Sequence, residues 1–265
     1  ALVAPARQLA TRPASGGTWA VIVGINDYPG QGSDLRAAVN DATDMDMALA
    51  GMGVPAENRL VLLDGQATAS RIREAIGWLA SRAGPDATAV FFYGGHVRKL
   101  GPLTEAIVAA DGGLIDDRQL EEHLSHVAAR RAWIAMASCF GGGFTEVLAP
   151  GRVLTGAAPA DALAYETTEY GRSFLVQYMV REAMIEKRAA SSVQAAFSYA
   201  TAELARRHPT RLPVQVDLAG GPLDLRPLVA AASATPPLAP PAPAVPTPST
   251  TAPCRRVLLV LGCSG

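Results

Sequence analysis

Two apolar stretches of the sequence each lead to a residue that can take part in nucleophilic catalysis. Residues 131–137 precede Cys139, which three glycines follow within four residues, and residues 87–95 precede His96. If both stretches are neighbouring parallel strands, they end at the same sheet edge, where ligands of open α/β sheets bind. An imidazole beside a thiol lowers the thiol pKa and can then protonate a leaving amine. The two residues are therefore a candidate acyl-transfer pair.

The elements expected around this pair alternate between strands and helices. Continuous apolar runs predict buried parallel strands, and apolar positions three or four residues apart predict amphipathic helices. We expect strands at 19–25, 59–63, 87–95, 131–137, 152–158 and, as an edge strand, 213–218. We expect helices at 35–52, 69–83, 117–127, 171–187 and 191–207, and a hairpin at 98–110. This order implies right-handed crossovers and a mostly parallel sheet with helices on both faces.

Each member of the pair lies in a motif that resembles one known family. Tyr93-Gly-Gly-His96 resembles the Tyr-Ser-Gly-His motif, and Ala137-Ser-Cys139-Phe-Gly-Gly resembles the Asp-Ser-Cys-x-Ser-Gly motif, of caspases and metacaspases. The resemblance is greatest to the bacterial metacaspase-like members, the orthocaspases. The histidine precedes the cysteine by 43 residues (139 minus 96), close to the roughly 50 residues of caspases. The resemblance covers residues 19–225 and implies the fold class α/β, as a caspase-like three-layer sandwich.

The resemblance implies a cysteine-type endopeptidase, a hydrolase that uses a Cys-His dyad to cleave a protein or peptide. Cys139 is the expected nucleophile, and His96 is the expected general acid and base. The backbone N–H groups of Cys139 and Val97 are expected to form the oxyanion hole. Val97 stands where the family usually has glycine, so its amide can serve only if the site needs no positive φ. The dyad itself requires no cofactor.

The family also implies a preference for arginine or lysine before the scissile bond, held by two carboxylates. Asp41 matches the carboxylate of the first helix, but Ala137 stands where the second is expected, two residues before the cysteine. Losing one partner of a desolvated cation costs roughly 3–5 kcal/mol, which is enough to redirect specificity. Asp161, in the loop after the next strand, either compensates for this loss or is an ordinary loop residue.

Four acidic residues resemble the cluster that binds activating calcium in some metacaspases. They are Asp111, Asp116, Asp117 and Glu146. Carboxylate oxygens are suitable ligands for this hard cation. The alternative is that Asp116 or Asp117 caps the helix that follows it. Calcium is therefore a candidate cofactor, and saturable calcium-dependent activity is the expected consequence.

Composition restricts the remaining partners. The chain has 265 residues, of which 49% are hydrophobic and 18% charged, and its net charge is -1. These values fit one large globular domain with its own core. The near-neutral balance argues against nucleic acid as a partner, because phosphate binding needs clustered lysine and arginine. No run approaches the roughly 18 apolar residues of a membrane span, and the sequence leaves the oligomeric state open.

The ends of the chain differ in composition from its centre. We expect a flexible N-terminal segment at 1–18, the peptidase domain at 19–226, a Pro/Ala-rich linker at 227–253 and a short C-terminal segment at 254–265. Cys254 and Cys263 in the last segment can form a disulfide. The chain begins with Ala1, which fits a processed or truncated chain. This favours an exported protein, in the envelope or outside the cell, over a cytoplasmic one.

Two other functions share parts of this pattern. Ala137 and Val97 also fit a catalytically weakened caspase-like scaffold that binds partners through its proline-rich tail. A catalytic thiol reacts with iodoacetamide well below pH ~8, whereas a structural thiol does not, and this difference separates the two functions. A nucleotide-binding sheet domain is not supported, because neither a Gly-x-Gly-x-x-Gly nor a Walker-type loop occurs.

Overall fold

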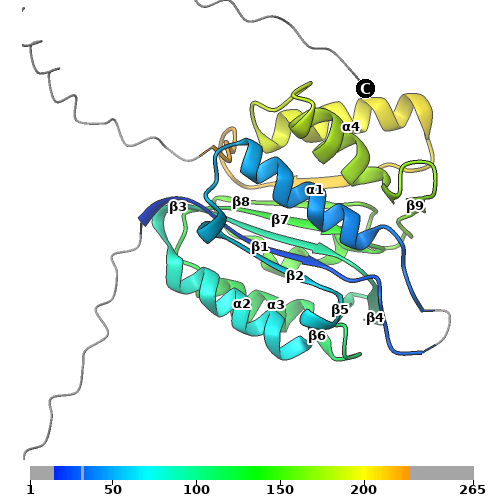
Figure 1. Ribbon diagram of the computed structural model, residues 1–265, viewed down its shortest axis with the longest axis horizontal. Coiled ribbons are helices and arrows are strands. Elements are labelled where there is room, and N and C mark those ends of the chain that lie inside the picture. Colours follow the sequence, from blue (N-terminus) through cyan, green and yellow to red (C-terminus); the bar gives the residue numbers. More distant parts are fainter. Residues whose placement is uncertain (1–14, 31–32, 227–265) are drawn as a thin grey trace, which may run out of the picture. The chain divides into compact units, whose positions relative to one another are not determined.

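A six-stranded sheet forms the centre of the computed structural model, which describes residues 15–30 and 33–226 (Figure 1). Its strand order is β11-β8-β7-β3-β1-β2. All neighbouring strands are parallel except β11, which pairs antiparallel with β8 at one edge. The strands are β1 (Ser15–Gly24), β2 (Arg59–Leu63), β3 (Ala83–Gly94), β7 (Arg131–Ala137), β8 (Arg152–Gly156) and β11 (Val214–Asp217). The predicted mostly parallel sheet is confirmed.

Helices cover both faces of this sheet (Figure 1). One face carries α2 (Ala69–Arg82) and α3 (Asp117–Ser125), and the other carries α1 (Ala38–Gly51), α4 (Val193–Arg207) and the π-helix η5 (Val176–Ile185). Successive residues of β1 alternate between the two cores, with Val21 in the first and Ile22 in the second. Because strands covered on both faces bury every side chain, their sequences are continuously apolar. The predicted three-layer α/β sandwich is therefore confirmed.

Side chains at the N-termini determine where three helices begin. The Thr68 hydroxyl accepts a backbone N–H of α2, and the Ser192 hydroxyl accepts one of α4. Asp116 starts α3 with a capping box, in which its carboxylate accepts the Gln119 N–H and the Gln119 side chain accepts the Asp116 N–H. Each such cap contributes about 1 kcal/mol to helix stability. These helices therefore begin close to the residues that the sequence predicts.

Two smaller antiparallel sheets accompany the central one. The first contains the predicted hairpin and consists of β4 (Val97–Gly101), β5 (Thr104–Val108) and β6 (Leu114–Asp116). The second pairs β9 (Glu166–Thr167) with β10 (Arg172–Ser173). Four 3-10 turns complete the described elements: η1 (Ala56–Asn58), η2 (Asp64–Gln66), η3 (Gly141–Gly143) and η4 (Thr145–Val147). Within residues 15–30 and 33–226, no helix has the length and apolar character needed to cross a bilayer.

The helix predicted at 171–187 begins later than the sequence indicates. Arg172 and Ser173 form β10, because they are bound to the first helix: Arg172 pairs with Asp44, and the Ser173 N–H donates to Asp41. Only after these residues does the chain coil into η5, which has π-type rather than α-type turns. Apolar periodicity does not reveal these contacts, because their partners lie far earlier in the sequence.

Some other boundaries also differ from the prediction or cannot be compared with it. Residues 84 and 85, expected to close the second helix, belong to β3, and β1 starts at Ser15 rather than at Trp19. The strand predicted at 152–158 ends at Gly156. The predicted linker at 227–253, the segment at 254–265 and the Cys254–Cys263 disulfide lie outside the described residues.

Candidate active site

Strand register places the two candidate catalytic residues just beyond the ends of two neighbouring strands, at the same edge of the sheet. Gly94 at the end of β3 pairs with Ala137 at the end of β7, and His96 and Cys139 each lie two residues farther along the chain. Neighbouring strands are about 4.8 Å apart. Both residues line one open cavity of about 110 Å³, to which α1 and the segment after β8 also contribute. The register therefore brings a thiol and an imidazole to the same cavity.

The turn after β7 presents the Cys139 thiol to this cavity. Cys139 is half-buried, and its Sγ donates a weak hydrogen bond to the carbonyl oxygen of Ala164 at 3.6 Å. Phe140 has a left-handed φ of 56°, which reverses the chain directly after the cysteine. A Cβ at Gly143 would overlap the Glu105 carboxyl group, so a larger residue there would force this buried side chain to move. The backbone consequently folds away from the cavity while the thiol remains at it.

His96 is held by three polar contacts that the sequence did not predict. Its Nε2 lies 2.7 Å from the carbonyl oxygen of Ser33, and its backbone N–H donates to the Tyr28 hydroxyl at 2.8 Å. The Tyr93 hydroxyl donates to the His96 carbonyl oxygen at 2.7 Å. Because a carbonyl oxygen can only accept, a neutral His96 ring carries its proton on Nε2. Nδ1 is then the nitrogen that can accept a proton.

The two tyrosines beside His96 remain protonated across the physiological range. Burial raises the pKa of Tyr93 well above its ordinary value, and burial also raises the pKa of Tyr28. The Tyr28 ring also packs against the His96 ring, with 4.7 Å between centroids. Two neutral phenols therefore fix the backbone and the ring of His96 without adding charge to the site.

Asp41 is the acidic residue that lines the cavity from α1. Its side chain is buried, and its carboxylate oxygens accept the Ser173 N–H at 3.0 and 3.3 Å. Burial raises the pKa of Asp41 to about 7, although the hydrogen bonds from Ser173 oppose this rise. Desolvation outweighs the hydrogen bonds because it penalises the ionised form throughout a buried site. Asp41 is therefore poised to change its charge near neutral pH.

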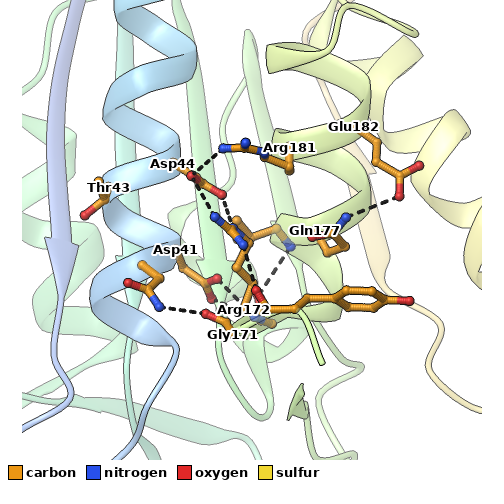
Figure 2. Close-up of polar contacts among 12 residues, drawn as sticks. Asp41, Thr43, Asp44, Gly171, Arg172, Gln177, Arg181 and Glu182 are labelled. Carbon is orange, nitrogen blue, oxygen red and sulfur yellow. Dashed lines mark hydrogen bonds and ion pairs between the residues drawn. The ribbon is translucent and has the colours of Figure 1, made fainter. Parts of the chain in front are cut away.

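A second acid of α1, Asp44, joins this helix to β10 and η5 (Figure 2). Its buried carboxylate pairs with Arg172 of β10 and, at 3.4 Å, with Arg181 of η5. Figure 2 shows Asp44 between the two guanidinium groups, with Asp41 one turn nearer the start of α1. Sequence analysis did not single out Asp44, although its spacing of three from Asp41 places both on one helix face. The Asp44 network positions β10, whose Ser173 N–H binds Asp41.

The caspase domain model (Peptidase C14) matches residues 18–217, which is 200 of the 265 residues. The chain belongs to the caspase-domain family. Metacaspase-1A of Aspergillus oryzae is 36% identical over 84 residues, which are 29% of this chain. The match spans only 20% of that relative's length.

Two solved structures share the fold of this caspase domain. A crystal structure of the Geobacter sulfurreducens protein GSU0716 matches with a TM-score of 0.61 and 17% identity, over 76% of this chain and 92% of that one. The Drosophila initiator caspase Dronc matches with a TM-score of 0.58 and 10% identity, over 79% of this chain and 83% of that one. At these identities the likeness establishes the fold.

Val97 occupies the position after the histidine in this caspase domain. It begins β4, its φ is not positive, and its side chain packs against the core beneath α2 and α3. A valine therefore introduces no backbone strain there, because strain arises only at positive φ. Within the described part of the chain, Val97 is not among the residues that line the cavity. Its amide, like that of Cys139, stays a predicted oxyanion donor.

The segment after β8 places a different acid at the cavity from the one that the sequence suggests. Asp161 is exposed and does not line the described cavity, whereas Glu166 does. The Glu166 carboxylate accepts the backbone N–H groups of Arg36 and Ala37 at the start of α1. Glu166 is not predictable from the sequence, because these contacts join residues about 130 positions apart. Asp161 is therefore not positioned to compensate for Ala137 in this structure.

The four residues of the predicted calcium cluster do not fit one ion in this structure. Asp111 and Asp117 accept backbone N–H groups, Asp116 caps α3, and Glu146 is exposed on η4. Among residues 15–30 and 33–226, no group of three or more His, Cys, Asp or Glu side chains could hold a metal. The capping alternative describes Asp116, and calcium dependence stays a prediction.

Proposed function

We propose that this caspase-domain chain is a cysteine endopeptidase in which Cys139 and His96 form the catalytic dyad. The observation that carries the proposal is the register of β3 and β7, which places both residues at one cavity. Membership of the caspase-domain family supports a cysteine peptidase. Substrates of this activity are proteins or peptides.

The proposed reaction proceeds through a thioester. Nδ1 of His96 accepts the thiol proton, since Nε2 donates to Ser33. The Cys139 sulfur attacks the substrate carbonyl carbon, and the backbone N–H groups of Cys139 and Val97 stabilise the resulting oxyanion. The ring then protonates the leaving amine as the C–N bond breaks. A water molecule, deprotonated by the same ring, hydrolyses the thioester and releases the thiol.

We further propose that the side chain before the scissile bond is basic. Asp41 supports this specificity, because it lines the cavity that also contains Cys139. A bound cation favours the ionised form of a nearby carboxyl group and offsets part of the desolvation that raises the Asp41 pKa. Ala137 removes one of the two carboxylates that the family resemblance implies, so the pocket should hold a cation less tightly. Asp41 is then the one expected carboxylate that remains.

Cleavage of a peptide with arginine before the scissile bond tests the dyad. Cys139→Ala and His96→Ala should each abolish most turnover, and the double variant should lose little more, because the two residues act as one unit. His123→Ala on α3 is the matched control, since this histidine lies on another element and does not line the cavity. Full activity of the Cys139→Ala chain would refute the assignment.

A catalytically weakened scaffold is the second candidate function, and the alanine at 137 and the valine at 97 favour it. Iodoacetamide labelling of Cys139 separates the two candidates in a chain with Cys254→Ser and Cys263→Ser. A catalytic thiol should react well below pH ~8 and lose this reactivity in the His96→Ala chain. A thiol that reacts only at higher pH, together with no cleavage of any peptide, would support the scaffold.

A further inference from the structure

We propose that Glu166 is the second acid of the substrate pocket and replaces the carboxylate missing at position 137. The inference rests on the proposed peptidase function, because it concerns the side chain that precedes the scissile bond. Glu166 begins β9 and lines the cavity that also contains Asp41, His96 and Cys139. Two carboxylates therefore reach this cavity, one from α1 and one from the segment after β8.

The N-terminus of α1 holds Glu166 at the cavity while leaving it able to bind a ligand. Its Oε2 accepts the N–H groups of Arg36 and Ala37 at 3.0 and 2.9 Å, and its Oε1 lies 3.2 Å from the Arg36 nitrogen. A carboxylate offers about four acceptor positions, so these bonds do not exhaust it. The side chain is exposed, and a ligand can therefore reach the remaining positions.

Two further groups of the cavity, besides Glu166, can accept hydrogen bonds from a cation. Asp41 supplies a buried carboxylate, and the Ser138 hydroxyl is buried without a hydrogen-bond partner among the described residues. A buried polar group without a partner is unfavourable until a ligand supplies one. A guanidinium carries five N–H donors in one plane and no acceptor. The set of acceptors therefore fits an arginine side chain better than a neutral one of the same shape.

Neighbouring positive charges limit where such a cation can lie. A second groove, also lined by Tyr165 and Glu166, contains Arg207 and Arg211. The Arg211 guanidinium lies over the Tyr165 ring, 3.4 Å from its centroid. These arginines repel a substrate cation, so its favourable position is in the cavity that Glu166 shares with Asp41.

Peptide binding to the full chain with Cys139→Ala tests this inference without requiring turnover. One fluorescent peptide carries arginine before the scissile bond, and a matched peptide carries citrulline, which has nearly the same shape but no charge. The ratio of the two affinities is measured by fluorescence polarisation in three chains that all carry Cys139→Ala: one without a further change, one with Glu166→Gln and one with Asp161→Asn. Glutamine keeps one acceptor oxygen for α1, and thermal unfolding checks that each variant is folded.

We expect Glu166→Gln to lower the arginine-to-citrulline affinity ratio about threefold, because water screens the charge of this exposed carboxylate, and Asp161→Asn to leave the ratio unchanged. An unchanged ratio, an equal loss for both peptides, or no binding of either peptide would overturn the role of Glu166. Cleavage by the chain with Cys139 intact is measured in parallel. If the chain cleaves the peptide but the affinity ratio does not depend on Glu166, only the role of Glu166 is refuted. If the ratio depends on Glu166 but no peptide is cleaved, only the proposed peptidase function is refuted.

Discussion

Replacement of Asp41 by asparagine should make the protein less sensitive to rising pH. Asparagine keeps an oxygen that can accept the Ser173 N–H but cannot ionise. In the native chain, burial raises the Asp41 pKa from 3.8 to about 7. Between these values the folded chain binds more protons than the unfolded chain, so stability falls as pH rises. Asparagine removes this dependence.

The size of the effect follows from the two pKa values. At 1.36 kcal/mol per pKa unit, the interval from 3.8 to about 7 corresponds to roughly 4 kcal/mol. The loss begins above the unfolded pKa and is complete once the pH passes the folded pKa. Roughly 3 kcal/mol of it therefore falls between about pH 5 and about pH 8.

Urea unfolding at these two pH values measures the effect in the native chain, in Asp41→Asn and in the control Asp161→Asn. The free energy of unfolding of Asp41→Asn, relative to the native chain, should increase by roughly 3 kcal/mol from about pH 5 to about pH 8. Asp161 is exposed, so its variant should follow the native chain. If the difference between Asp41→Asn and the native chain is the same at both pH values, Asp41 does not titrate in this range and the reasoning is wrong.

Three further outcomes test other parts of the site. Tyr28→Phe should lower kcat about tenfold with little change in KM, because it leaves the His96 N–H without its acceptor. Steady-state kinetics measure both constants, and a change in KM alone would contradict this expectation. Gly143→Ala should lower the free energy of unfolding by about 1–3 kcal/mol through overlap with Glu105, whereas Gly77→Ala, with open space around it, should be neutral or stabilising. Equal effects of the two alanines in urea unfolding would count against this packing. Saturable activation of turnover by calcium would require Asp111 and Asp117 to leave their backbone partners and gather with the other two acids, and turnover that neither calcium nor a chelator changes would remove the calcium prediction.

The strands that carry the dyad are predictable from the sequence because each is covered on both faces. β3 and β7 are apolar along most of their length, and the ends of these apolar runs predict that His96 and Cys139 lie at the edge of the sheet. Neither run specifies its neighbour or its register. The pairing of Gly94 with Ala137, which brings the two residues together, comes from packing of the whole sheet.

The proposed acidic pocket is less predictable, because the position of its second carboxylate, Glu166, depends on a tertiary contact. Asp161 and Glu166 both lie between β8 and β10, and nothing in the sequence distinguishes one acid from the other. Only Glu166 meets the N-terminus of α1, where the amides of Arg36 and Ala37 bind it. The carbonyl oxygen of Ser33, which fixes the His96 proton, is unpredictable for the same reason, since every residue has such an oxygen.

The proposed catalytic residues and the proposed substrate-selecting residue Glu166 belong to different kinds of element. His96 and Cys139 follow strands that two cores hold in place, whereas Glu166 comes from a connection with only two short strands. Replacement of the Glu166 side chain leaves these strands unaltered, whereas the backbone of the same connection binds the cysteine turn through the carbonyl oxygens of residues 162 and 164. Under the proposed function, a change of peptide preference would therefore come from side chains of this connection while its backbone stays in place.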